Sequence, residues 1–300
     1  MTSARVGDVT IEFESTGEGQ PLLLVMGLAS QLIHWPDEFV TELADRGFHV
    51  IRFDNRDIGL STKMAGRPPG LGRTIASMMS RKLAKSDYVL ADMANDAAGL
   101  LDHLGIGAAH VVGVSMGGMI AQSLAIAHPA KVASLTSIMS NTGDRKHGRV
   151  AVSLLSRMPK YLKSSPETMM ANALALNRLV AGDEFDEARA REMIQRAFER
   201  DYDPRGTARQ TAAIAASPDR TAALRNVTAP TLVIHGLADK LVQPSGGIAT
   251  ARAVPGSRLL MFPGMAHDLP HTRWTEVIDA IVTNTARATR APIAARAAGA

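Results

Sequence analysis

The sequence predicts an α/β protein built on a mostly parallel sheet, and three features of the 300-residue chain carry this prediction. Short runs rich in apolar and β-branched residues alternate with helix-like segments. A Gly-x-Ser-x-Gly pentapeptide joins one such run directly to a helix pattern. A long interval after the sixth run contains helix patterns and no strand pattern. Alternation of this kind is typical of a parallel sheet that helices cover on both faces.

The order of the elements follows from these runs. We expect eight strands, at residues 4–6, 9–14, 21–26, 48–53, 109–114, 133–138, 230–235 and 258–262. Helices are expected between most of them, at Pro36–Arg46, Asp87–Leu104, Gly117–His128 and Trp274–Thr285. The core would then comprise residues 1–140 and 219–285, with a helical cap, residues 141–218, inserted after the sixth strand. Residues 286–300 alternate arginine with alanine, and we expect a disordered tail there.

Composition excludes several classes of protein. Apolar residues make up 46% and charged residues 21%, as in ordinary soluble domains, and no apolar run is long enough for a membrane span. The first residues lack the apolar core of a secretory signal, so we expect a cytoplasmic protein. The absence of cysteine excludes disulfides, thiolate zinc sites and a thiol nucleophile. The net charge of +4 is not gathered into a basic, aromatic-containing run, so nucleic-acid binding is not expected.

The pentapeptide of residues 113–117 places Ser115 between a strand and a helix. Glycines on both sides allow the backbone to turn sharply, which would present the serine hydroxyl at the edge of the sheet. The amino end of the following helix favours negative charge at that point. Ser115 is therefore the candidate nucleophile.

A serine hydroxyl needs a base to take its proton and an acid to orient that base. His267 follows the last predicted strand and Asp239 follows the one before it, so both should lie at the same sheet edge as Ser115. Asp144, after the sixth strand, is the alternative acid, and we favour Asp239. His235 ends the strand that leads to Asp239.

A tetrahedral intermediate also requires hydrogen-bond donors for its oxyanion. We expect these to be the backbone N–H of Met116, directly after the serine, and that of Leu28, in the turn after the third strand. No cofactor and no metal are expected. His267 and His271 have the spacing of helical metal ligands, but Pro270 would interrupt such a helix.

The stretches "GVSMGGMIAQ" and "GMAHDLP", with "LLLVMGLASQLIHWPDEFVTELADRGFHVIRFDNRDIGLST", resemble the α/β-hydrolase superfamily. Within it they resemble the actinobacterial esterase/lipase group that includes aclacinomycin methylesterase. The resemblance reaches about residue 285 and implies cofactor-independent ester hydrolysis by Ser115, Asp239 and His267. Many members have His-Gly at the oxyanion turn where this chain has Met26-Gly27, and Asp57 occupies a position at which the Asp-x-x-Gly-x-Gly-x-Ser turn has glycine.

The sequence thus predicts a serine hydrolase that cleaves a small carboxylic ester, apolar on its acyl side, through an acyl-enzyme. The same three residues could serve a thioesterase, a phospholipase-type acyl hydrolase, a lactonase or a C–C bond hydrolase, or survive in a non-catalytic ligand-binding homologue. Candidate pocket residues are His34 and Trp35, for which ordinary packing is the alternative, and Met158 in the Met-containing cap. Residues 71–85 form a basic amphipathic pattern, which we interpret as a lid helix in preference to a membrane-surface contact. Nothing in the sequence predicts an oligomeric state.

Overall fold

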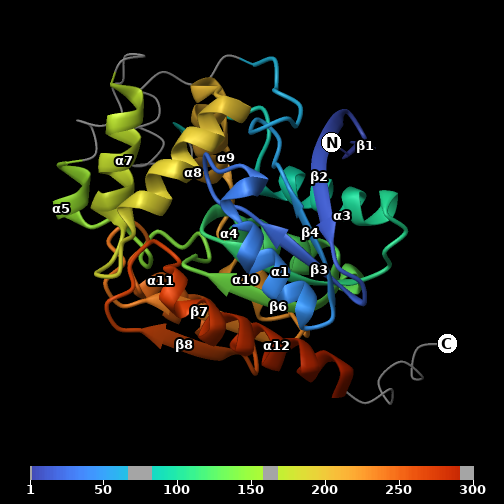
Figure 1. Cartoon of the computed structure of the whole chain (residues 1–300). Coiled ribbons are helices and arrows are strands. Elements are labelled where there is room, and N and C mark those ends of the chain that lie inside the picture. The colour runs from blue at the N-terminus through green and yellow to red at the C-terminus, as the bar shows by residue number, and fades with distance from the viewer. Residues whose placement is uncertain (1, 67–82, 158–167, 291–300) are drawn as a thin grey trace.

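The computed structural model describes residues 2–66, 83–157 and 168–290, and an eight-stranded sheet lies at its centre (Figure 1). The strands follow the order β1-β2-β4-β3-β5-β6-β7-β8. Neighbouring strands in the run β4-β3-β5-β6-β7-β8 are parallel, whereas β2 is antiparallel to both β1 and β4. The predicted mostly parallel sheet is therefore confirmed. Its strands are β1 Thr2–Val6, β2 Val9–Thr16, β3 Gln20–Val25, β4 Phe48–Phe53, β5 Ala109–Val114, β6 Val132–Ile138, β7 Thr231–Gly236 and β8 Arg258–Phe262.

The central strands are buried on both faces, which explains why they are continuous apolar runs and not alternating ones. In β3, Leu23 and Val25 belong to one core, while Leu22 and Leu24 belong to a second core on the opposite face. All four side chains are fully buried. Two cores, one on each side of the sheet, follow from the two-residue period of a strand.

Helices cover both faces of the sheet, as Figure 1 shows. On one face lie α3 (Leu90–His103), α4 (Met116–Ala127) and α11 (Ser245–Ala253); on the other lie α1 (Asp37–Asp45) and α12 (Trp274–Arg290). Helix α4 is buried along nearly its whole length, and its sequence is accordingly apolar almost all round. A short helix, α10 (Thr221–Leu224), precedes β7.

Between β6 and β7 the described residues form helices and no strand. We call four of them the inserted helices: α5 Val152–Leu155, α7 Met169–Val180, α8 Glu187–Arg200 and α9 Pro204–Ala216. The carboxylates of Asp186 and Asp203 accept backbone N–H groups at the starts of α8 and α9, and so define where these helices begin. The inserted helices lie where the cap was expected, and the cap boundaries at 141 and 218 stay a prediction.

Helix α12 ends later than the sequence predicts. It runs to Arg290, so the expectation of disorder was wrong for residues 286–290. The guanidinium of Arg287 explains the extension, because it donates hydrogen bonds to the carbonyl oxygens of Thr231 (3.2 Å) and Gly256 (2.7 Å). These bonds tie the last turns of the helix to the amino end of β7 and to the turn that precedes β8.

Some predictions fall outside the described residues. Met158 is one of them, and so is the pattern at 71–85 apart from its last three residues. Within the part of the chain that the structure describes, no helix combines the length and the apolar character that crossing a bilayer requires.

Candidate active site

Ser115 occupies a strained turn between β5 and α4. Its φ of 55° lies in the left-handed region, which residues other than glycine rarely adopt. The two flanking glycines leave no room for a side chain. A Cβ on Gly113 would lie 2.2 Å from the carbonyl oxygen of Gly117, and one on Gly117 would lie 2.0 Å from that of Val25. The pentapeptide is therefore required by close backbone packing, and it presents the serine at the carboxyl edge of the sheet.

The side chains of Ser115, His267 and Asp239 form one continuous hydrogen-bonded chain. The Ser115 Oγ lies 2.9 Å from Nε2 of His267, and Nδ1 of the same ring lies 2.7 Å from Oδ2 of Asp239. Asp239 follows β7 and His267 follows β8, so neighbouring parallel strands deliver both groups to the edge at which β5 delivers the serine. The structure thus brings together the three residues that the sequence singled out.

The Asp239 carboxylate is fully buried and ionised. Burial raises its pKa, but hydrogen bonds involving His235 and His267 and the N–H of Val242 outweigh burial and lower the pKa to about 2. Oδ1 accepts the N–H groups of Leu241 (2.8 Å) and Val242 (2.9 Å), which leaves Oδ2 for the imidazole of His267. A carboxylate held in this way keeps the proton of that imidazole on Nδ1 and leaves Nε2 free to accept one.

His235 is a second histidine beside Asp239. Its Nε2 lies 2.7 Å from the Val242 carbonyl oxygen and 3.4 Å from Oδ2 of Asp239. A carbonyl oxygen can only accept, so Nε2 carries the proton, and the buried Nδ1 has no partner among the described residues. The position at the end of β7 was the only sign of this contact in the sequence.

Asp144, the alternative acid, lies in a different environment. Its Oδ2 is 2.5 Å from Nδ1 of His147, and its Oδ1 accepts the N–H of Lys146. The carboxylate bonded to His267 is that of Asp239.

The 27–31 turn after β3 lies directly beside Ser115. A Cβ on Gly27 would stand 3.2 Å from the Cβ of Ser115. The backbone N–H groups of Leu28 and Met116 donate no hydrogen bond to any of the described residues. Met116 begins α4, where the first N–H groups of a helix have no partner within the helix. Leu28 and Met116 therefore carry unpaired backbone N–H groups in the two turns that meet at Ser115, and their role as oxyanion donors stays a prediction.

The three predicted pocket residues lie in different environments. Trp35 is 1% exposed and stacks on Phe39 at 5.5 Å, inside the core beneath α1 and α12, so it belongs to ordinary packing. Nδ1 of His34 accepts the N–H of Gln31 (3.0 Å). Burial lowers the pKa of His34 to about 4, and the ring is neutral at pH 7. Met158 lies outside the described residues.

The loop that carries His267, residues 263–269, is tied to the inserted helices. The N–H of His267 donates to the Val180 carbonyl oxygen (2.9 Å) at the end of α7. In the link between α7 and α8, the Gly182 N–H donates to the Asp268 carboxylate (3.1 Å) and the Asp183 N–H donates to the Gly264 carbonyl oxygen (3.1 Å). The sequence held no local sign of these contacts between distant segments.

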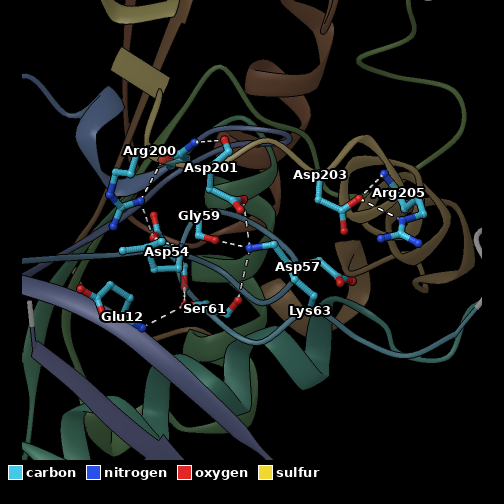
Figure 2. Close-up of polar contacts among 12 residues, drawn as sticks. Glu12, Asp54, Asp57, Gly59, Ser61, Lys63, Arg200, Asp201, Asp203 and Arg205 are labelled. Carbon is cyan, nitrogen blue, oxygen red and sulfur yellow. Dashed lines mark hydrogen bonds and ion pairs between the residues drawn. The ribbon is translucent and has the colours of Figure 1, made fainter. Parts of the chain in front are cut away.

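A polar cluster joins the loop after β4 to α8 through Asp54 and Arg200 (Figure 2). The guanidinium of Arg200 also donates to the side-chain oxygen of Gln31 in the 27–31 turn (2.8 Å). Asp54 is fully buried; its carboxylate contacts Nη1 of Arg200 at 2.7 Å and accepts the N–H groups of Leu32 and Leu60. Burial raises the pKa of Asp54, and these partners oppose that rise.

Asp57 gives a second buried link, to α9. It adopts a φ of 74° at the position where the superfamily pattern has glycine. Its carboxylate contacts Nη2 of Arg209 at 2.6 Å and accepts the Tyr88 hydroxyl (2.7 Å) and the Met64 N–H (2.8 Å). The departure from the pattern thus supplies a charged anchor for an inserted helix.

The site gives no indication of a metal centre. Among residues 2–66, 83–157 and 168–290, no group of three or more His, Cys, Asp or Glu side chains could hold a metal ion.

Comparison with known proteins agrees with this architecture. Residues 20–273 match the family model described as "alpha/beta hydrolase fold". The chain belongs to the α/β-hydrolase fold family. Its predicted membership is therefore confirmed, and a hydrolase is the coarse activity that the relatives support.

Three relatives are informative. The chain is 29% identical to rhodomycin D methylesterase DnrP of Streptomyces peucetius, covering 94% of this chain and 97% of that protein. It is 27% identical to the putative non-heme bromoperoxidase BpoC of Mycobacterium tuberculosis, covering 86% and 91%. A solved structure of a thermophilic esterase from Thermogutta terrifontis is 25% identical, with a TM-score of 0.71 and coverage of 95% and 96%.

Proposed function

We propose that this α/β-hydrolase is a serine esterase that cleaves carboxylic esters through an acyl-enzyme. The observation that carries the proposal is the unbroken chain from Ser115 Oγ through the His267 ring to the buried Asp239. Similarity to a methylesterase and to an esterase supports ester as the substrate class. The acyl side is proposed to be apolar and the substrate a small molecule.

The geometry suggests the order of proton transfers. Nε2 of His267 takes the proton of Ser115 Oγ as the oxygen attacks the ester carbonyl carbon. The oxyanion that forms accepts the N–H groups of Leu28 and Met116. His267 then gives its proton to the leaving alcohol, and the acyl group stays on Ser115. A water molecule, deprotonated by His267, attacks the acyl carbon and releases the acid and the free serine. Asp239 keeps the ring in the required tautomer and stabilises the imidazolium.

Steady-state hydrolysis of p-nitrophenyl esters of increasing acyl length, with wild type and Ser115→Ala, tests the proposal. We expect many turnovers by the wild type and a loss of at least about 10³-fold in kcat for the variant, because the nucleophile is gone. The preferred acyl length would then measure the pocket. Equal activity of the two proteins, or none from either on any ester, thioester or lactone, would contradict the proposal. Multiple turnovers also separate an enzyme from a ligand-binding homologue that keeps its triad.

A further inference from the structure

The inserted helix α9 contacts the 27–31 turn through Gln210. The carboxamide oxygen of this residue accepts the backbone N–H of Ala29 at 3.2 Å, across 181 residues of sequence. Ala29 has a φ of 63°, in the left-handed region. A non-glycine residue keeps such a conformation only where its surroundings enforce it. The hydrogen bond from Ala29 to Gln210 is one of the contacts that do so.

The orientation of the Gln210 amide is fixed by its second partner. The side chain is fully buried, and its Nε2 donates to the Arg56 carbonyl oxygen at 2.9 Å. Because a carbonyl oxygen can only accept, Nε2 must face Arg56 and Oε1 must face Ala29. Both ends of the amide are thus engaged, and neither can rotate without leaving a buried group unpaired.

The segment of helix α9 that carries Gln210 is itself held firmly in place. The preceding residue, Arg209, pairs with buried Asp57 at 2.6 Å. One turn earlier, a Cβ on Gly206 would lie 2.0 Å from the Asp57 carbonyl oxygen, so the helix backbone lies against the loop after β4. Helix α9 therefore offers a fixed platform for its glutamine.

The peptide between Leu28 and Ala29 is held from both sides. Gln210 accepts its N–H, and the Ser30 hydroxyl donates to its oxygen, the Leu28 carbonyl, at 3.3 Å. The next peptide toward the amino end carries the Leu28 N–H, and the two peptides meet at a single Cα. Fixing the plane of one therefore limits the direction in which the other N–H points.

A neighbouring glutamine holds the far end of the same turn. The Gln31 side chain donates to the carbonyl oxygens of Ala197 (2.7 Å) and Asp201 (2.8 Å) at the end of α8, and accepts Nη1 of Arg200. The turn is thus fastened to two inserted helices and is not supported by the sheet alone.

We propose that Gln210 is a positioning residue for the oxyanion hole. By accepting the Ala29 N–H, it directs the Leu28 N–H toward the ester carbonyl oxygen, which becomes the oxyanion in the transition state. The proposal rests on the proposed esterase function. The Gln210 side chain forms its hydrogen bonds with Ala29 and Arg56 and not with Ser115 or His267, so its effect passes through the 27–31 turn. Removing an oxyanion donor lowers kcat by about 10²–10³-fold, and a displaced donor should lose part of that.

Three variants test the proposal in the full chain. Gln210→Met keeps the length of the side chain and loses both hydrogen bonds. Gln210→Glu keeps an acceptor for the Ala29 N–H. Its carboxylate has no proton to donate, so the bond to the Arg56 carbonyl oxygen is lost. Thr211→Val is the matched control on the same helix, because among the described residues the Thr211 hydroxyl bonds only within α9, to the Thr207 carbonyl oxygen (2.8 Å).

The readouts are kcat and KM on the best p-nitrophenyl ester, the Ki of a trifluoromethyl ketone of matching acyl length, and the Tm. For Gln210→Met we expect kcat to fall by about 10- to 100-fold with little change in KM, and the Ki of the ketone to rise by a similar factor, because the ketone forms an oxyanion and the ground-state ester does not. Gln210→Glu should lose less kcat, and Thr211→Val should behave as the wild type.

Two results would overturn the proposal. One is a Gln210→Met protein with wild-type kcat and Ki. The other is a Glu variant that loses as much kcat as the Met variant, since the acceptor would then be irrelevant. If the Met variant fails to fold, the Glu variant is compared with the wild type, and a fall of its kcat by about 100-fold overturns the proposal. If the wild-type protein turns over no ester at all, it is the esterase function that fails, and the two failures are therefore distinguishable.

Discussion

The buried pair between Asp57 and Arg209 allows a quantitative prediction about stability. Substitution of Asp57 by glycine removes a carboxylate that is 0% exposed and leaves a guanidinium that is 6% exposed without its main partner. Loss of one member of a buried pair costs about 3–5 kcal/mol of unfolding free energy. Arg209 keeps a weaker contact to Asp203 at 3.5 Å, so the lower end of that range applies.

The backbone at this position works in the opposite direction. Residue 57 has a φ of 74°, and glycine adopts this conformation more readily than aspartate by about 1 kcal/mol. We therefore expect Asp57→Gly to lower the unfolding free energy by about 2 kcal/mol. Asp57→Ala loses the same carboxylate without relieving the backbone, and should be less stable than the glycine variant by about 1–2 kcal/mol.

Urea unfolding at pH 7, followed by circular dichroism, measures both numbers. Arg209→Met, alone and combined with Asp57→Gly, completes a double-mutant cycle. The double variant should lose less than the sum of the single losses, because neither charge is then buried alone. Strict additivity, or a glycine variant as stable as the wild type, would refute the reasoning.

Two further predictions concern the triad acid and the serine turn. The pKa of Asp239 is about 2 in the folded chain and about 3.9 in an unfolded one, so its ionisation should stabilise the fold by about 2.5 kcal/mol well above pH 4, and most of that effect should be lost as the pH falls through 2. Urea unfolding of Asp239→Asn should lack this drop; equal slopes for both proteins between pH 4 and pH 2 would contradict it. Gly117→Ala, with its Cβ 2.0 Å from a backbone oxygen, should prevent folding or lower the Tm sharply, whereas Gly107→Ala points into open space and should change stability by less than about 0.5 kcal/mol. A Gly117→Ala protein that melts with the wild type would count against the packing argument.

Much of the fold was predictable because its signals are local. Short apolar runs such as that of β3 indicate a buried strand or a buried helix, and their length decides between the two. The Gly-x-Ser-x-Gly pentapeptide likewise contains the turn that it specifies, so Ser115 was predictable from five residues. His267 and Asp239 followed from the rule that parallel strands end at one edge.

The rest depends on contacts between distant residues. Nothing near Gln210 indicates that its amide reaches Ala29, and nothing near Val180 indicates that its carbonyl oxygen receives the His267 N–H. The end of α12 was missed for the same reason, because Arg287 finds its partners on other elements. Asp57 is the exception. Because it stands where the superfamily pattern has glycine, the sequence marked this position as unusual, although it did not indicate that Arg209 is the partner of Asp57.

The hydrogen bonds that the inserted helices make to the 27–31 turn and to the 263–269 loop limit how this enzyme can be re-engineered. Exchanging residues 141–218 for the corresponding segment of a related hydrolase would transplant a new binding surface, but would also remove the supports of a candidate oxyanion donor and of the candidate general base. A successful chimera would need a glutamine at the place of Gln210 and a glycine at the place of Gly182, where a Cβ would lie 2.2 Å from the Gly264 carbonyl oxygen. Under the proposed function, the same inserted helices would therefore influence both the substrate range and the reaction rate, so that the two properties would change together when this segment is exchanged.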